Sequence, residues 1–208
     1  MTLLGAAQIR ELAAQLDLKP SKSLGQNFVI DSNVCTKIVR TAGVTSDDIA
    51  LEIGPGLGSL TLAMLEVAQS VIAVEIDSRL AQQLPITVAQ HFEHPENLTV
   101  INMDALAVNE LPVAPTVLVA NLPYNVSVPV LLHLLEKFPT LRTGVVMVQA
   151  EVADRLAAKP GGKEYGIPSV KAAWWADVKN VGTVSRSIFW PAPNVDSKLV
   201  GFTRRETA

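Results

Sequence analysis

The stretch Val117-Leu-Val-Ala-Asn-Leu-Pro-Tyr-Asn-Val-Ser127 begins with four apolar residues and runs directly into Asn-Leu-Pro-Tyr. A short apolar run bounded by turn residues is typical of a buried strand in a parallel sheet. Residues just past the carboxyl end of such a strand line the crevice where open α/β sheets bind ligands. Asn121 offers a hydrogen-bond acceptor and donor, and Tyr124 offers a flat aromatic face, so this turn is suited to a planar base with an exocyclic amine. From these residues alone, a plain strand-to-helix turn remains an equal alternative.

Segments on both sides of this stretch alternate between helix and strand patterns. Apolar residues at every third or fourth position from Ile9 to Leu16 predict a helix, and Asp31 is placed to cap a second one. Pro85 is expected to kink or end a third helix. Strands are expected at residues 49–53, 70–76, 98–103, 117–120, 144–149, 178–184 and 198–203. Strands separated by helices, followed by two late strands with a short link, predict an α/β fold with a mostly parallel seven-stranded sheet and helices on both faces.

A glycine-rich turn follows the first of these strands. Its spacing, Gly54-Pro-Gly-Leu-Gly58, is G-x-G-x-G and not the G-x-G-x-x-G of dinucleotide sites. Glu75 ends the next strand, where a carboxylate can accept both hydroxyls of a ribose. Asp104 follows the strand after that, where it can accept from an adenine amino group. These features predict a site for an adenosine-bearing ligand without phosphates. S-adenosylmethionine fits best, because acidic surroundings also tolerate its sulfonium.

The charge is unevenly distributed along the 208 residues. Residues 41–136 carry eleven carboxylates and a single base, Arg79, whereas residues 1–40 have a net charge of +2 and residues 137–208 a net charge of +5. Basic ends around an acidic centre suit a protein that faces a polyanion while its centre holds something small or cationic. The total of −3 and the pI of about 5.6 are nevertheless low for a nucleic-acid binder.

Several classes of protein and site are not supported. No apolar run approaches the roughly 20 residues of a membrane span, and the N-terminus turns polar too soon for a secretory signal. Cys35 is the only cysteine, which excludes an internal disulfide and a Cys-rich metal site. The three histidines, His91, His94 and His133, are too scattered to predict a metal. We expect a cytoplasmic protein with no membrane partner and no metal.

With a methyl donor bound nearby, the Asn-Leu-Pro-Tyr turn can act on an adenine amino group. Adenine N6 is a poor nucleophile because its lone pair is delocalised into the ring. Accepting its two N–H bonds, one at the Asn121 side-chain oxygen and one at the Leu122 carbonyl, would favour a pyramidal nitrogen aimed at the methyl carbon. Positioning and electrostatics then suffice without a strong base. Pro123 stiffens the turn, and Tyr124 would stack on a base that is unpaired or has left its helix.

Four motifs together resemble those of the KsgA (RsmA) small-subunit rRNA adenine dimethyltransferases. They are Leu24-Gly-Gln-Asn-Phe28, Glu52-Ile-Gly-Pro-Gly56, Asn121-Leu-Pro-Tyr-Asn-Val-Ser127 and Pro193-Asn-Val-Asp-Ser197. The resemblance covers about residues 19–202. It implies a Rossmann-like, class I S-adenosylmethionine-dependent methyltransferase domain at residues 1–208, with residues 1–30 forming an N-terminal helix and a cofactor-closing loop. The family normally continues into a small helical domain, which we expect to be absent from a chain ending at Ala208.

The resemblance also implies an activity and roles for single residues. The activity is dimethylation of N6 on two adjacent adenines near the 3′ end of small-subunit (16S) rRNA, within an assembling subunit, and we expect a monomer. Gln26, Asn27 and Val29 would close over the cofactor, although the family usually has Leu at the position of Val29. Phe189 would be a second aromatic face for the base, beside Tyr124. The residues implied to hold the cofactor are Gly54, Gly56, Glu75, Ile76, Asp104, Ala105 and Asn121.

Other functions stay open at this point. An Erm-like enzyme would methylate large-subunit rRNA, and an assembly factor would depend on binding more than on catalysis. A DNA adenine methyltransferase is a weaker alternative, because no target-recognition segment is visible. Lys19, Lys22 and the loop at residues 159–163 are candidate phosphate contacts or simply solvated. Trp174 and Trp175 are expected in the core.

Overall fold

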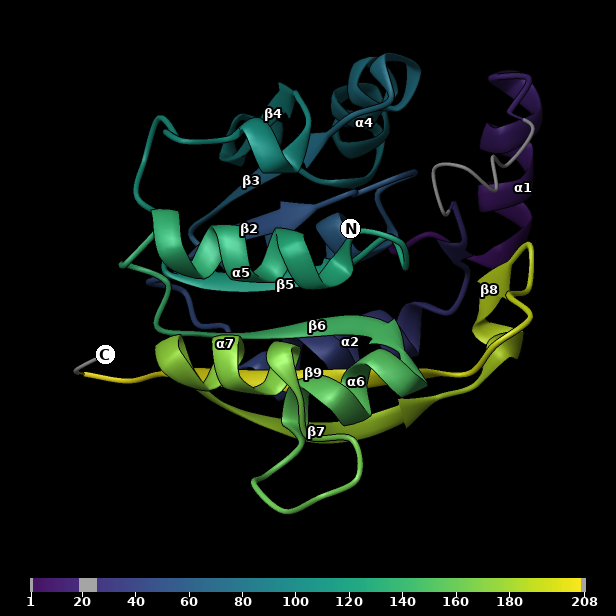
Figure 1. Cartoon of the computed structure of the whole chain (residues 1–208). Coiled ribbons are helices and arrows are strands. Elements are labelled where there is room, and N and C mark those ends of the chain that lie inside the picture. The colour runs from purple at the N-terminus through teal and green to yellow at the C-terminus, as the bar shows by residue number, and fades with distance from the viewer. Residues whose placement is uncertain (1, 19–25, 207–208) are drawn as a thin grey trace.

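A computed structural model describes residues 2–18 and 26–206 and contains the predicted seven-stranded sheet (Figure 1). In spatial order its strands are β4 (Leu98–Asn102), β3 (Ser70–Glu75), β2 (Ile49–Ile53), β5 (Val117–Asn121), β6 (Thr143–Gln149), β9 (Ser197–Arg204) and β7 (Ala176–Val184). The first five strands are parallel, and β9 is antiparallel to both of its neighbours. The predicted fold class, including the antiparallel end, is confirmed.

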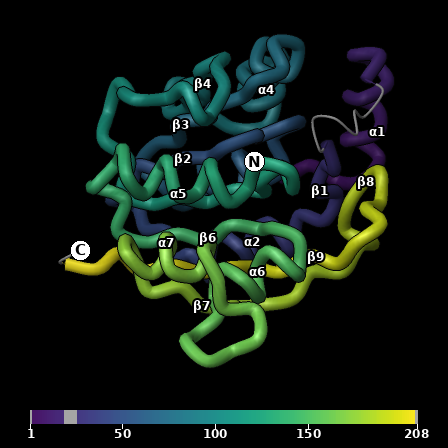
Figure 2. The backbone as a smooth tube through the Cα atoms, in the orientation of Figure 1, coloured from purple at the N-terminus to yellow at the C-terminus, as the bar shows by residue number. Residues whose placement is uncertain are grey.

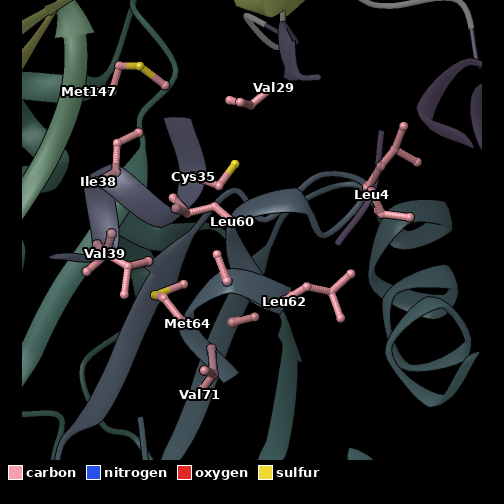
Figure 3. Packing of buried hydrophobic residues seen from close by; sticks show 14 of the residues in the cluster. Leu4, Val29, Cys35, Ile38, Val39, Leu60, Leu62, Met64, Val71 and Met147 are labelled. Carbon is pink, nitrogen blue, oxygen red and sulfur yellow. The ribbon is translucent and has the colours of Figure 1, made fainter. Parts of the chain in front are cut away.

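Helices cover both faces of the sheet and bury two separate apolar clusters. The first cluster takes residues from α1 (Ala6–Gln15), α2 (Ser32–Ala42), α3 (Ser59–Leu65) and α4 (Ser78–His91), and Figure 3 shows part of it. The second takes residues from α5 (Ser127–Lys137), α6 (Ala150–Ala157) and α7 (Ile167–Trp175). Strand β5 supplies Val117 and Val119 to the first cluster and Leu118 and Ala120 to the second. This alternation explains why its first four residues are all apolar.

The helix boundaries confirm one local prediction and restrict another. Asp31 caps α2, because its side chain accepts the N–H groups of Asn33 and Val34 at 3.0 and 3.2 Å. Pro85, expected to kink or end a helix, does not end it, since α4 continues through it to His91. Pro85 itself is exposed, so its ring does not disturb the packing of the helix. Leu84 and Val88 are fully buried and hold the helix against the sheet.

A two-stranded ribbon that the sequence patterns do not predict joins distant parts of the chain. Strand β1 (Phe28–Val29) pairs with β8 (Phe189–Trp190) in antiparallel register, and Figure 2 shows the two segments side by side. The ribbon places residues just before α2 next to residues shortly before β9.

The two edges of the parallel sheet differ in what they carry. The winding of the chain reverses between β2 and β5, so a crevice is expected where the carboxyl ends of these strands meet. At the amino edge, Asp48 connects the starts of several strands. Its carboxylate accepts hydrogen bonds from the N–H and hydroxyl of Thr45, from the hydroxyl of Thr116 and from the guanidinium of Arg142.

No helix in the described parts of the chain is long and apolar enough to cross a membrane.

Candidate active site

A pocket lies at the carboxyl edge where β2 and β5 meet, and it brings the predicted cofactor residues together. All ten of them line it: Gln26, Asn27, Val29, Gly54, Gly56, Glu75, Ile76, Asp104, Ala105 and Asn121. Its lining also includes Glu52, Phe28, Met103 and Pro123. Topology accounts for this convergence, because the residues come from the ends of neighbouring strands and from the segment next to β1.

The glycine turn needs its glycines for backbone conformation and for space. Gly54 and Gly56 have φ values of +68° and +58°, in the left-handed region that favours glycine. A Cβ on Gly56 would also lie 3.0 Å from the Phe28 ring. In this conformation the Gly56 N–H points toward Glu75 and donates to its carboxylate at 3.2 Å.

Two buried carboxylates lie beneath this turn. Glu75 is 4% exposed and accepts the N–H groups of Asp77 and Gly56, yet burial raises its pKa above the ordinary value. Glu52 is 1% exposed, and burial raises its pKa to about 8 despite a 2.6 Å hydrogen bond from the Thr61 hydroxyl, with the charge of Glu75 adding to the rise. Sequence reasoning gave Glu52 no role. The signal was present, since an acidic residue stands in an otherwise apolar strand.

The outer part of the pocket combines apolar surface with an exposed acceptor. Ile76 and Met103 are about half exposed although both are large and apolar. Asp104 is exposed, and one of its oxygens accepts the Leu106 N–H at 2.9 Å, which starts the short 3-10 turn Ala105–Ala107. Apolar flanks beside a carboxylate suit a flat heterocycle with an amino group at its edge. Among the described residues that line the pocket there is no Lys, Arg or His to bind a phosphate.

Three contacts hold the segment before and within β1 over the pocket. The Gln26 amide donates to the Asp77 carboxylate at 3.3 Å, and the Ser59 hydroxyl donates to the Val29 carbonyl at 2.7 Å. The Asn121 amide donates to the Asn27 carbonyl at 3.0 Å. The segment predicted to close over the cofactor is therefore attached to the residue predicted to hold the target base. The first residues of its motif, with Lys19 and Lys22, lie outside the described residues.

The turn after β5 places its four predicted residues differently. Asn121 and Pro123 line the pocket. Leu122 is 1% exposed, and its N–H donates to the Met147 carbonyl of β6. Tyr124 is half buried, and its hydroxyl lies 2.7 Å from that of Ser197 at the start of β9. Burial raises the pKa of Tyr124, and the Ser197 hydrogen bond partly offsets the rise. Sequence reasoning found Ser197 only as part of a motif.

Phe189 lies in the apolar core and does not line the pocket. It is 3% exposed, belongs to the first cluster, and pairs with Val29 across the ribbon. Its neighbour Trp190 stacks on Phe28, with ring centroids 6.4 Å apart and an interplanar angle of 23°. A role for Phe189 as second aromatic face requires its ring to turn outward and stays a prediction.

Two surface predictions have different outcomes. Trp174, expected in the core, is 62% exposed, because it occupies the outer side of α7, whereas Trp175 packs partly buried against the second cluster. Lys159 and Lys163 are exposed in the loop before α7, so this loop can be either a phosphate contact or simply solvated.

Within residues 2–18 and 26–206, no group of three or more His, Cys, Asp and Glu side chains is arranged to hold a metal.

Comparisons with known proteins agree with this geometry. The family model described as "Ribosomal RNA adenine dimethylase" matches residues 18–208. "Ribosomal RNA small subunit methyltransferase A" of Leifsonia xyli subsp. xyli is 63% identical over 208 residues, which cover 100% of this chain and 74% of that protein.

Two solved structures extend the comparison. A dimethyladenosine transferase from Plasmodium falciparum is 33% identical with a TM-score of 0.77, covering 86% of this chain and 64% of that one. The 23S rRNA methyltransferase ErmE is 31% identical with a TM-score of 0.75, covering 87% of this chain and 71% of that one. The chain therefore belongs to the ribosomal RNA adenine dimethylase family.

Proposed function

We propose that this chain uses S-adenosylmethionine to dimethylate N6 of two adjacent adenines near the 3′ end of small-subunit rRNA in an assembling subunit. The observation that carries the proposal is the position of Asn121, whose amide donates to the Asn27 carbonyl in the same pocket as Glu75 and Asp104. The Leifsonia relative named for the small subunit is 63% identical, whereas ErmE, named for 23S rRNA, is 31% identical. This difference favours the small subunit over an Erm-like target.

The pocket fits S-adenosylmethionine in its chemistry. Glu75 would accept the ribose hydroxyls, Asp104 the adenine amino group, and Ile76 and Met103 would flank the ring. The carboxylates and the absence of Lys, Arg and His among the described lining residues favour a cationic ligand without phosphates. Gln26, Asn27 and Val29 would close over it. Because these residues all belong to one chain, a monomer would suffice.

The residues of this chain would act by positioning. When bound, S-adenosylmethionine supplies an electrophilic methyl group: the adenine N6 lone pair forms the new N–C bond, sulfur keeps the electron pair of the broken C–S bond, and N6 loses a proton to water. The Asn121 amide nitrogen is occupied by Asn27, so its oxygen is directed to accept one N6–H. The Leu122 carbonyl would accept the other, and Tyr124 would stack on the base.

The remaining elements of the proposal concern the partner and its compartment. Residues 137–208 carry a net charge of +5 and would face the RNA, while the acidic centre holds the cofactor. A ribosomal subunit under assembly would place the protein in the cytoplasm.

The test is transfer of labelled methyl groups to small subunits purified from a strain that lacks this modification, with naked large-subunit RNA in parallel. Label recovered as N6,N6-dimethyladenine from the small subunit would support the proposal. Label only in large-subunit RNA would favour the Erm-like alternative. No transfer, with cofactor binding intact by calorimetry, would contradict the proposal that this chain alone carries the activity.

A further inference from the structure

A residue outside the turn after β5 holds the ring of Tyr124. The Tyr124 hydroxyl lies 2.7 Å from the Ser197 Oγ, and Ser197 is 1% exposed. Ser197 begins β9 and is paired with Gln149 of β6 and with Val184 of β7. Because its backbone is fixed from both sides, its hydroxyl can move only by rotation about χ1. Ser197 is therefore a rigid anchor for the far end of the tyrosine ring.

The turn itself fixes the backbone of Tyr124 but not the direction in which its ring extends. The Val126 N–H donates to the Pro123 carbonyl at 3.2 Å, and the Ser127 hydroxyl donates to the Tyr124 carbonyl at 3.4 Å. Both contacts involve main-chain atoms of the turn. The contact between the Tyr124 hydroxyl and Ser197 restrains χ1, which sets where the ring lies, whereas rotation about χ2 leaves the phenolic oxygen in place. A stacking partner needs a defined position beside the base, so this restraint bears directly on the base.

We propose that Ser197 is a positioning residue that holds the Tyr124 ring against the target adenine, and that it matters more for the second methyl transfer than for the first. The inference rests on the function proposed above. Each transfer replaces one N6–H by N6–CH3. Unmethylated adenine offers two N–H donors, to the Asn121 oxygen and the Leu122 carbonyl, whereas monomethyladenine offers one. With one hydrogen bond fewer, stacking on Tyr124 carries a larger share of the positioning.

The test compares Ser197→Ala and Tyr124→Phe, which remove the same hydrogen bond from opposite sides, with their double variant. The matched control is Ser169→Ala on α7, since Ser169 is also 1% exposed and its hydroxyl donates to the Arg155 carbonyl. Time courses on unmodified small subunits would be digested to nucleosides, and monomethyladenine and dimethyladenine quantified. Calorimetry with S-adenosylmethionine would show whether cofactor binding is unchanged.

We expect each single variant to slow the second transfer by about 3- to 10-fold and the first by at most about 2-fold, so that monomethyladenine accumulates. The double variant should be no slower than either single variant, and Ser169→Ala should leave the product ratio unchanged. An unchanged ratio in Ser197→Ala, equal slowing of both transfers, or multiplied effects in the double variant would overturn the role of Ser197.

A second variant tests the same hydrogen bond if Ser197→Ala does not fold, because Tyr124→Phe removes the hydroxyl and keeps the ring. A wild-type chain that transfers no methyl group would overturn the proposed function itself. A wild-type chain that dimethylates, beside variants that do so with the same product ratio, would overturn only the inference about Ser197.

Discussion

The amino and carboxyl edges of the parallel sheet each bury a carboxylate, and the two are treated in opposite ways. At the amino edge, Asp48 is buried, but hydrogen bonds from Thr116 and Thr45 and the charge of Arg142 outweigh burial and lower its pKa. At the carboxyl edge, burial dominates and raises the pKa of Glu52 to about 8. The negative charge of Asp48 is compensated by partners within the fold, whereas the ionised form of Glu52 is poorly compensated.

This difference separates stability from binding within one sheet. The network around Asp48 joins the starts of β2, β5 and β6 and requires no ligand. Glu52 and Glu75 line the pocket, where a cationic ligand would favour their ionised forms. Changes at the amino edge should therefore alter folding with little effect on turnover per folded molecule. Changes at the carboxyl edge should alter ligand binding or turnover, and at Glu52 they should also alter the pH dependence of stability.

The largest effect is expected for Asn121→Ala. Loss of the amide removes the proposed N6–H acceptor and the contact to Asn27, so we expect methyl transfer to fall about 100- to 1,000-fold. The unfolding free energy should change by less than about 1 kcal/mol, because Asn121 is only partly buried. Single-turnover assays and urea unfolding would measure the two quantities. The same variant addresses the assembly-factor alternative, since subunit maturation that survives without methyl transfer would favour that role.

A pH-dependent effect on the order of 3 kcal/mol is expected from Glu52 in the ligand-free chain. Its folded pKa of about 8 lies above the ordinary value of 4.5. The folded state therefore keeps a proton that the unfolded state loses, and stability present below about pH 4.5 is lost as the pH rises toward 8. Urea unfolding at pH 5, 6.5 and 8 should show this decline, and Glu52→Gln should remove it. The exposed Glu66→Gln serves as control; a decline of equal size in both variants would exclude Glu52 as its source.

At the amino edge, Asp48→Asn should lower the unfolding free energy by about 2 kcal/mol at pH 7, because buried donors lose their carboxylate partner. The folded pKa of Asp48 is lowered, so its contribution is present above the ordinary value of 3.8 and is lost as the pH falls below it. Urea unfolding at pH 7 and pH 3.5 would test both points. Arg142→Ala, at a side chain that is 64% exposed, should cost less than about 1 kcal/mol. An equal cost would show that the ion pair, and not the threonines, carries the effect.

The smallest effect is expected for Asp104→Ala, which should weaken S-adenosylmethionine binding by about 10-fold, the value of one charge-assisted hydrogen bond. Asp104→Asn can keep the acceptor for the Leu106 N–H, so comparing the two variants by calorimetry separates the local turn from the ligand contact. Identical affinity in wild type and Asp104→Ala would contradict a role in binding the adenine.

The parts of the fold that depend on local pattern were predictable. The strand at residues 49–53 was predicted with its observed bounds, and the residues at the strand ends assemble because parallel strands bring their carboxyl ends to one edge. The pairing of β1 with β8 was not predictable, because two-residue strands have no periodicity and their register depends on tertiary contacts. The possible helix end at Pro85 was not found for a similar reason, since packing of the residues on either side of it outweighed the low helix propensity of proline.

Side-chain exposure was the hardest property to infer. Trp174 is apolar enough for a core, yet the rotation of α7 leaves it exposed, and the sequence of a nine-residue helix does not determine that rotation. Phe189 shows the opposite case, because pairing with β1 places it in the first apolar cluster, where it is buried. The raised pKa of Glu52 depends on burial by several elements at once, which no single segment reveals.

The position of β9 has a consequence for the order of events during synthesis. Among the described strands of the sheet it comes last along the chain, yet it lies between β6 and β7. A nascent chain that has released β7 must keep a place open beside β6 until residue 204 emerges, and Phe28 and Val29 must wait for residues 189 and 190. Such long-range pairing is slow to form. Newly made chains should therefore gain methyltransferase activity only after residue 204 has emerged, however early the glycine turn has folded.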